Sequence, residues 1–380
     1  MDMIENYIGE LMANSTPDRP IWNIEKILQG KKSGWNYIDG CMIKAVMEMY
    51  TITKEQKYLD FADAFVDFKV SDDGSIDGYR VEELNLDNIN AGKTLSELYD
   101  ITGKEKYLKA IRLIYSQIEQ MPRTPSGNFW HKNIYPNQVW LDGLYMCQPF
   151  YMEYEKRFNE GRNCDDIYRQ FSNVIKNMRD PLTGLYYHAY DESREMYWCD
   201  TVTGLSQNFW LRALGWYSMA LLDTVEKVGD DPRAEEMKQA FADLMAALVK
   251  YQDASGMWYQ LVNLGQMEDN YLETSGTAIL SYALLKGTRL GYLPKECAEA
   301  GKKAFAGICD KYLSEDEQGK MHLGGICLVA GLGGKQHRDG TYAYYMSEPV
   351  VADDAKGVGP FLLAYTEMRR LGDVSTFIKK

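Results

Sequence analysis

Two kinds of helix-forming segment alternate along this chain, and the alternation restricts the possible folds more than any other feature. Segments of the first kind, such as 104–121 and 233–253, place apolar residues at steps of three or four with charged residues between them. That period gives a helix one apolar and one hydrated face. Segments of the second kind carry few charges and are apolar on most sides, which predicts buried helices. They are 37–50, 86–102, 140–154, 210–225, 273–292 and 353–372.

Each buried segment has a glycine near its start, and these glycines recur roughly every 50–80 residues, which indicates a repeat of helical hairpins. They are Gly40, Gly92, Gly143, Gly215, Gly276 and Gly357. Six such hairpins predict an all-α fold, an (α/α)6 barrel with short β-like pieces in its loops. We expect residues 1–380 to form one catalytic domain of this kind. An open superhelical solenoid uses the same units, and the periodicity alone does not separate the two.

The composition limits the partners of the chain. A net charge of −13 argues against nucleic acid and anionic membranes, because both attract basic surfaces. No apolar run predicts a membrane span, and the N-terminus lacks the features of a signal peptide. Seven cysteines without a CxxC pair favour reduced thiols and a cytoplasmic location. No cluster has metal-ligand spacing, so we expect neither metal nor cofactor, and nothing indicates an obligate protein partner.

Two acidic residues stand at the starts of neighbouring buried helices. In a closed ring these helix starts gather around a common hollow, which would bring Asp87 and Asp142 near each other. Each carboxylate has two interpretations. It either caps its helix, or belongs to a pair in which burial and a neighbouring charge keep one carboxyl protonated. The aromatic surroundings favour the second interpretation.

Arg212 and three histidines are the other polar candidates. Arg212 lies in an apolar stretch, and a buried guanidinium needs either an internal anion or a substrate carboxylate. His131, His188 and His322 share a phase of the repeat, and Lys132 follows the first of them. Hydrogen bonding in a polar seam and a role in the site both remain open for the histidines.

Aromatic residues concentrate at the same end of the repeat. Most of them would belong to the core, while a few would stack on sugar rings. They are Trp35, Tyr37, Trp130, Tyr187, Trp198, Trp210, Trp216 and Trp258. Among these we expect Trp35, Tyr37, Trp210 and Trp216 to bind substrate.

Six motifs carry a resemblance to a known family, in order from about residue 30 to the C-terminus. They are GWNYIDG (34–40), LDNINAGK (86–93), VWLDGLYM (139–146), FWLRALGW (209–216), ETSGTAILSYALLKGTRLGYL (273–293) and EPVVADDAKGVGPFLLA (348–364). With these motifs the chain resembles glycoside hydrolase family 105, the unsaturated rhamnogalacturonyl hydrolases. It is less similar to family 88, the unsaturated glucuronyl hydrolases. Departures in LRALGW and at Asp353, where the family commonly has Asn, leave the acidic pair untouched and the substrate detail open.

The resemblance implies an (α/α)6 barrel that hydrates a vinyl ether. The implied substrate is a lyase-generated rhamnogalacturonan (pectin) oligosaccharide with a 4,5-unsaturated galacturonic acid at its non-reducing end. An acid protonates C4, water adds at C5, and the hemiketal rearranges to release the saturated sugar. Asp142 would be this acid, protonated at rest, and then the base that activates water. Asp87 would hold ring hydroxyls and support the proton on Asp142.

The resemblance also implies the walls of the pocket. Arg212, His188, Trp210 and Trp216 would surround the unsaturated sugar, with His131 and Lys132 near the uronate or the next sugar. Three alternatives stay open at this point: an unsaturated glucuronyl hydrolase acting on glycosaminoglycan-derived disaccharides, an inverting glycosidase, and a non-catalytic sugar-binding toroid.

Overall fold

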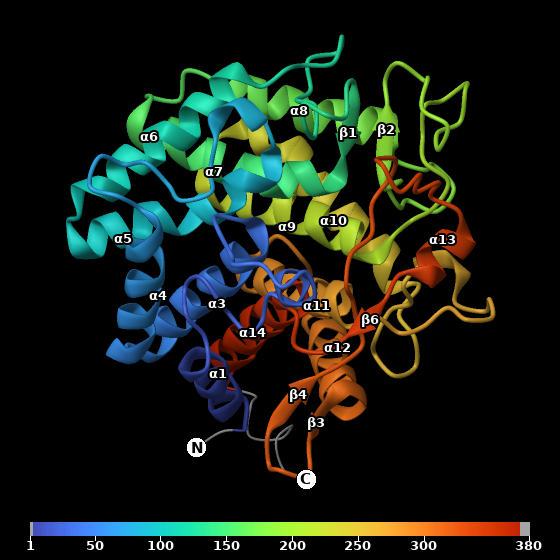
Figure 1. The fold of residues 1–380 in the computed structure, drawn as a ribbon. Coiled ribbons are helices and arrows are strands. Elements are labelled where there is room, and N and C mark those ends of the chain that lie inside the picture. Colours follow the sequence, from blue (N-terminus) through green and yellow to red (C-terminus); the bar gives the residue numbers. More distant parts are fainter. Residues whose placement is uncertain (1–2, 373–380) are drawn as a thin grey trace.

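The inner helices form a closed ring in the computed structural model, which describes residues 3–372. They are α3 (Tyr37–Thr53), the 3₁₀ helix η2 (Leu86–Thr94) continued by α5 (Leu95–Thr102), α7 (Leu141–Phe158), α9 (Leu211–Val228), α11 (Thr274–Arg289) and α14 (Ala355–Arg370). Consecutive inner helices contact each other, and α14 contacts α3, so the two ends of the series lie side by side (Figure 1). This last contact excludes the open solenoid and confirms the predicted six-hairpin toroid.

The outer helices cover this ring, and the sixth of them comes from the N-terminus. Five follow inner helices as expected: α4 (Gln56–Lys69), α6 (Glu105–Gln120), α8 (Cys164–Met178), α10 (Glu235–Val249) and α12 (Cys297–Tyr312). The sixth is α1 (Met3–Ala13), whose Glu5 forms an ion pair with Arg369 of α14. The sequence analysis did not predict this helix. Its signal was present, because the apolar residues Ile4, Tyr7, Ile8 and Leu11 repeat at helical spacing and all are buried.

Close approach of backbones explains the glycines of the inner ring. A Cβ atom at Gly40 would lie 2.7 Å from the Cα of Ala91, and one at Gly359 would lie 2.8 Å from the carbonyl oxygen of Cys41. Glycine therefore allows α3 to pack directly against η2 on one side and α14 on the other.

The second inner segment differs from the predicted regular helix, because its first nine residues form the 3₁₀ helix η2. Asparagine side chains bind backbone groups here. The side chain of Asn85 accepts a hydrogen bond from the N–H of Asp87, and that of Asn90 donates to the carbonyl oxygen of Tyr37. Such bonds compete with the regular α-helical pattern.

Short antiparallel strand pairs connect the hairpins. They are β1 (Gln138–Trp140) with β2 (Ala189–Asp191), β3 (Leu313–Glu315) with β4 (Met321–Leu323), and β5 (Ile326–Cys327) with β6 (Val350–Val351). Five short helices complete the fold: α2 (Ile24–Leu28), η1 (Val81–Glu83), η3 (Pro232–Ala234), η4 (Val262–Leu264) and α13 (Tyr342–Ser347). No helix within residues 3–372 is long and apolar enough to span a membrane.

Candidate active site

The two ends of the barrel differ in their electrostatics. An α-helix carries a partial positive charge of about 0.5 at its N-terminus and an equal negative charge at its C-terminus. The N-termini of the inner helices gather at the end that holds Asp142, Arg212 and Tyr37, each within the first turn of its helix. This end therefore favours an anionic ligand although the chain as a whole is acidic.

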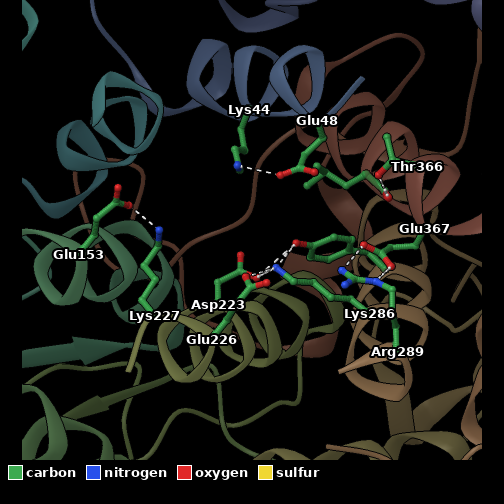
Figure 2. A network of polar contacts seen from close by, with 12 residues as sticks. Lys44, Glu48, Glu153, Asp223, Glu226, Lys227, Lys286, Arg289, Thr366 and Glu367 are labelled. Carbon is green, nitrogen blue, oxygen red and sulfur yellow. Dashed lines mark hydrogen bonds and ion pairs between the residues drawn. The ribbon is translucent and has the colours of Figure 1, made fainter. Parts of the chain in front are cut away.

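A network of ion pairs closes the opposite end, where the inner helices have their C-termini (Figure 2). Lys286 contacts Asp223 at 2.8 Å, and Arg289 contacts Glu367 at 2.7 Å. These cations compensate the negative ends of the helices. The network surrounds a cavity of about 270 Å³ whose wall includes Tyr145. Tyr145 and Trp216 stack with centroids 5.0 Å apart, one turn along their helices from Asp142 and Arg212.

Neither acidic residue of the predicted pair is a helix cap. The N-cap of α7 is Trp140, and Asp142 lies two residues beyond it. The N-cap of η2 is Asn85, and Asp87 again lies two residues beyond. Both side chains keep 14% of their surface exposed although they lie deep in the molecule. The capping interpretation is therefore wrong for both, and both carboxylates can face the hollow.

The strand pair β1–β2 places His188 beside Asp142. Trp140 pairs with Ala189 in this sheet, and the N–H of Leu141 donates to the carbonyl oxygen of His188. As a result Nε2 of His188 lies 3.3 Å from Oδ2 of Asp142. On the other side of the imidazole ring, Nδ1 of His188 lies 2.6 Å from the hydroxyl of Tyr345.

Asp87 is held by the loop that carries His131 and Lys132. The backbone of this loop pairs with the start of η2, because Leu86 N–H donates to the carbonyl oxygen of His131. Lys132 Nζ then lies 2.6 Å from Oδ2 of Asp87, and His131 Nε2 lies 3.6 Å from Oδ1. Burial opposes ionisation of Asp87, but the charge of Lys132 and its hydrogen bond outweigh burial and lower the pKa of this carboxyl. Burial also lowers the pKa of His131, to about 4, so this imidazole is neutral near pH 7.

His131 connects the two acidic residues. A Cβ atom at Gly143, the residue after Asp142, would lie 2.9 Å from Nδ1 of His131 and 3.0 Å from the side chain of Leu86. Glycine at this position lets the imidazole and the start of η2 pack directly against α7. Asp87 and Asp142 therefore lie on neighbouring elements with His131 between them.

Arg212 is buried, and no carboxylate within residues 3–372 forms an ion pair with it. Its Nη1 donates to the hydroxyl of Ser275 at 3.1 Å and to the carbonyl oxygen of Cys327 at 2.5 Å. Ser275 in turn donates to Glu273, the N-cap of α11. Arg212 therefore makes no direct ion pair in the described structure, although the charge of the Glu273 carboxylate acts on it through Ser275. A substrate carboxylate is the candidate for a direct partner.

Two of the predicted aromatic residues, Trp210 and Trp216, are buried beside the polar groups described above. Trp210 lies between Arg212, whose guanidinium is 4.7 Å from the ring centroid, and His188, whose ring is at 4.8 Å. Its exposed fraction is 1% and that of Trp216 is 2%. Their faces are covered by protein groups, so neither ring offers the open stacking surface that a sugar-binding aromatic residue needs. Trp35 donates its indole N–H to the carbonyl oxygen of Asn88.

Tyr37 is half-buried at the start of α3. Burial raises the pKa of its hydroxyl, and the charges of Glu25, Arg212 and Asp87 also act on it. The hydroxyl therefore lies where the fields of Arg212 and Asp87 overlap, and it keeps its proton near neutral pH.

Sequence reasoning missed two members of the site. Trp140 was assigned to no role, although it directly precedes α7. Tyr345 lies 157 residues from His188 on the short helix α13, and no periodicity of the segment 341–349 indicates that its hydroxyl reaches a histidine.

The sequence model described as Glycosyl Hydrolase Family 88 matches residues 8–372. The chain belongs to this family. It is thus an enzyme of the glycoside hydrolase class, as predicted, and a non-catalytic toroid is not supported.

Solved and curated relatives agree with this assignment. A solved glycoside hydrolase from family 105 of C. acetobutylicum is 44% identical, with a TM-score of 0.89, over 97% of this chain and 100% of that chain. Protein Atu3128 of Agrobacterium fabrum is 42% identical over 58% of this chain and 97% of its own length. The unsaturated rhamnogalacturonyl hydrolase YesR of Bacillus subtilis is 25% identical over 80% of this chain and 83% of its own length. The predicted resemblance to families 105 and 88 is confirmed.

Proposed function

We propose that this family 88 hydrolase removes a 4,5-unsaturated galacturonic acid from the non-reducing end of rhamnogalacturonan oligosaccharides by hydrating the double bond. The observation that carries the proposal is the contrast between the two carboxyls on either side of His131. Asp87 has an ammonium group 2.6 Å away, whereas no lysine or arginine within residues 3–372 forms an ion pair with Asp142. Different environments assign different roles to two neighbouring carboxyls.

Asp142 is then the group that transfers protons. It gives a proton to C4 of the alkene, and positive charge develops at C5 and the ring oxygen. Water attacks C5 and returns a proton to the Asp142 carboxylate, so the acid is regenerated. The hemiketal at C5 opens and releases the saturated sugar.

Arg212 and Asp87 orient the sugar in this proposal. Within residues 3–372 no carboxylate contacts the guanidinium directly, and its planar fork suits the uronate carboxylate. Asp87 is ionised beside Lys132, so it accepts hydrogen bonds from ring hydroxyls and stabilises nearby positive charge. Together they would hold C4 near Asp142.

The rhamnogalacturonan preference is supported by the name of one relative, YesR. A preference for glycosaminoglycan-derived unsaturated disaccharides is the competing hypothesis, because the sequence also resembles the unsaturated glucuronyl hydrolases of family 88. The reaction is the same for both substrates, so the aglycone alone separates the two.

The test follows the ultraviolet absorbance of the conjugated alkene. Lyase-digested rhamnogalacturonan, unsaturated chondroitin disaccharide and a saturated pectin fragment are each incubated with the protein and with the Asp142→Asn variant. We expect loss of absorbance with the first substrate and only with the wild type. Loss only with chondroitin disaccharide would overturn the aglycone assignment, and release of sugar from the saturated fragment would overturn the reaction.

A further inference from the structure

Asp142, His188 and Tyr345 form a linear chain of polar contacts. Oδ2 of Asp142 faces Nε2 of His188 at 3.3 Å, and Nδ1 of the same ring faces the Tyr345 hydroxyl at 2.6 Å. Within residues 3–372, Oδ2 and Nε2 are buried and neither makes a hydrogen bond, so their 3.3 Å approach is an electrostatic contact. His188 and Tyr345 are both fully buried. Within the described residues, each of these atoms therefore has its neighbour in this series of contacts as its polar partner.

The nitrogen of His188 that carries the ring proton determines which atoms in this series of contacts donate a hydrogen and which accept one. A neutral imidazole donates from one nitrogen and accepts at the other. Burial and the neighbouring Tyr344 and Asp142 raise the pKa of Tyr345, so its hydroxyl keeps its proton. His188 is the one partner of that hydroxyl in the described structure, and an O–H buried without an acceptor costs free energy. The hydroxyl therefore donates to Nδ1, which leaves the ring proton on Nε2.

A proton on Nε2 has a consequence for the carboxyl of Asp142. The Nε2–H group then faces Oδ2 at 3.3 Å, so Oδ2 is the oxygen of the carboxyl that lies beside this proton. Because Oδ2 is buried, the exposed 14% of the side chain lies on the rest of the group, and Oδ1 is the oxygen that can face the hollow. When Asp142 is protonated, its proton is then on Oδ1.

We propose that Tyr345 is a positioning residue that fixes His188 as the Nε2–H tautomer and thereby directs the acidic proton of Asp142 toward the substrate. The proposal rests on the function proposed above for Asp142. Tyr345 itself touches no reacting atom and transfers no proton. After Asp142 has given up its proton, the same Nε2–H stabilises the carboxylate until water protonates it again.

Two further contacts of the chain keep this geometry in place. The His188 ring packs edge-on against Trp140 at 5.4 Å and at a tilt of 44° against Trp210 at 4.8 Å, which restricts rotation of the imidazole. The strand pair β5–β6 joins Cys327 to Val350, and Arg212 also contacts Cys327. The segment that carries Tyr345 is thus tied to the wall that carries Arg212.

The variant Tyr345→Phe tests the proposal, because it removes the hydroxyl and keeps the ring. Without a donor at Nδ1 the ring proton can move to Nδ1, and the lone pair on Nε2 then draws the Asp142 proton onto the buried Oδ2. We expect kcat to fall about 10–100-fold, the magnitude typical of a group that orients a reactive residue. KM should stay within about twofold, because Arg212 and Asp87 are unchanged.

The matched control is Tyr344→Phe, the same substitution one residue earlier. The Tyr344 hydroxyl accepts a hydrogen bond from the N–H of Gly331 and does not contact His188. We expect its kcat and KM to equal those of the wild type. An equal loss of kcat in both variants would assign the effect to the helix α13 as a whole and overturn the proposal.

Nitrogen-15 spectra of the histidines provide a readout that is independent of substrate. The chain has four histidines, so the His188 signals can be assigned by comparison with single substitutions. We expect Nε2–H in the wild type and in Tyr344→Phe, and a shift toward Nδ1–H in Tyr345→Phe. An Nδ1–H ring in the wild type would overturn the proposal even if Tyr345→Phe does not fold. If the tautomers agree but no unsaturated substrate is hydrated, the proposed function fails and the assignment of Tyr345 stands.

Discussion

The indole of Trp140 stacks on the imidazole of His131, with ring centroids 4.6 Å apart and planes 12° from parallel. The same indole meets His188 edge-on at 5.4 Å. Trp140 directly precedes α7 and therefore stands between the histidine beside Asp87 and the histidine beside Asp142. Trp140 therefore packs against both the His131 side and the His188 side of the candidate site. We expect a substitution on one side to affect the geometry of the other.

Asp142→Asn should abolish most of the activity and leave the fold intact. The amide has nearly the same shape but cannot give a proton to the substrate, and loss of a general acid typically costs about 10²–10⁴-fold in rate. Turnover is measured from the loss of alkene absorbance, and folding from the melting temperature. Asp165→Asn is the control, because that side chain lies 80% exposed at the start of α8. Near-normal turnover in Asp142→Asn would remove Asp142 from the mechanism.

Arg212→Met should chiefly raise KM. A charge-assisted hydrogen bond contributes about 1.5–3 kcal/mol, which corresponds to a KM increase of about 10–100-fold. The variant also loses the bonds to Ser275 and Cys327, so a lower melting temperature is expected as well. Arg289→Met removes a cation from the opposite end of the barrel and should leave KM unchanged. A normal KM in Arg212→Met would show that this guanidinium does not bind the uronate.

His322 should stabilise the protein more at acidic than at alkaline pH. Its Nδ1 lies 2.6 Å from Asp353 and its Nε2 lies 3.2 Å from Asp316. The hydrogen bond to Asp353, followed by that to Asp316, raises the pKa of His322. The stabilisation is therefore complete below the unfolded value of about 6.5 and is lost as pH rises through the higher folded value.

Thermal denaturation of His322→Gln tests this sign. The melting temperature of the variant should fall furthest below that of the wild type near pH 6 and approach it near pH 9. His337→Gln, at an exposed position, should show no such trend. A gap that widens with pH would contradict the assigned direction. Because Asp353 also accepts a hydrogen bond from Tyr7, the effect reports on the contact between α1 and α14.

Lys93→Met should stabilise the protein, most strongly in acid. No carboxylate within residues 3–372 forms an ion pair with Lys93; its Nζ lies 2.5 Å from the carbonyl oxygen of Tyr145. Burial lowers the pKa of Lys93 to about 7, against about 10.4 in an unfolded chain. Below pH 7 the fold must hold a partly buried ammonium, and between the two values stability rises with pH. The melting temperature gained by the variant should therefore shrink from about pH 6 to about pH 9.

Lys335→Met removes an exposed lysine and is the control for this comparison. It should change the melting temperature little at either pH. If Lys93→Met raised the melting temperature equally at both pH values, the stabilisation would come from added apolar contact and not from removal of the lysine charge.

The helices and their order could be predicted because each depends on residues near one another in the chain. The spacing of apolar residues in 104–121 and 233–253 reports a single hydrated face, which is a local property. The same rule applies to Ile4, Tyr7, Ile8 and Leu11 of α1, so this helix was predictable from local sequence as well. The 3₁₀ start of the second inner segment was less accessible, because Asn90 bonds to Tyr37 of another helix.

The sequence by itself determined which helices are buried, which are amphipathic, and which polar residues stand at the starts of the buried ones. Only the tertiary structure decided that α14 closes the ring on α3, that Trp140 and Asn85 are the caps in place of Asp142 and Asp87, and that Tyr345 reaches His188. Periodicity records how one helix divides its surface between protein and water. It does not record which atom from a segment 157 residues away meets a given nitrogen, because that depends on the closure of all six hairpins at once.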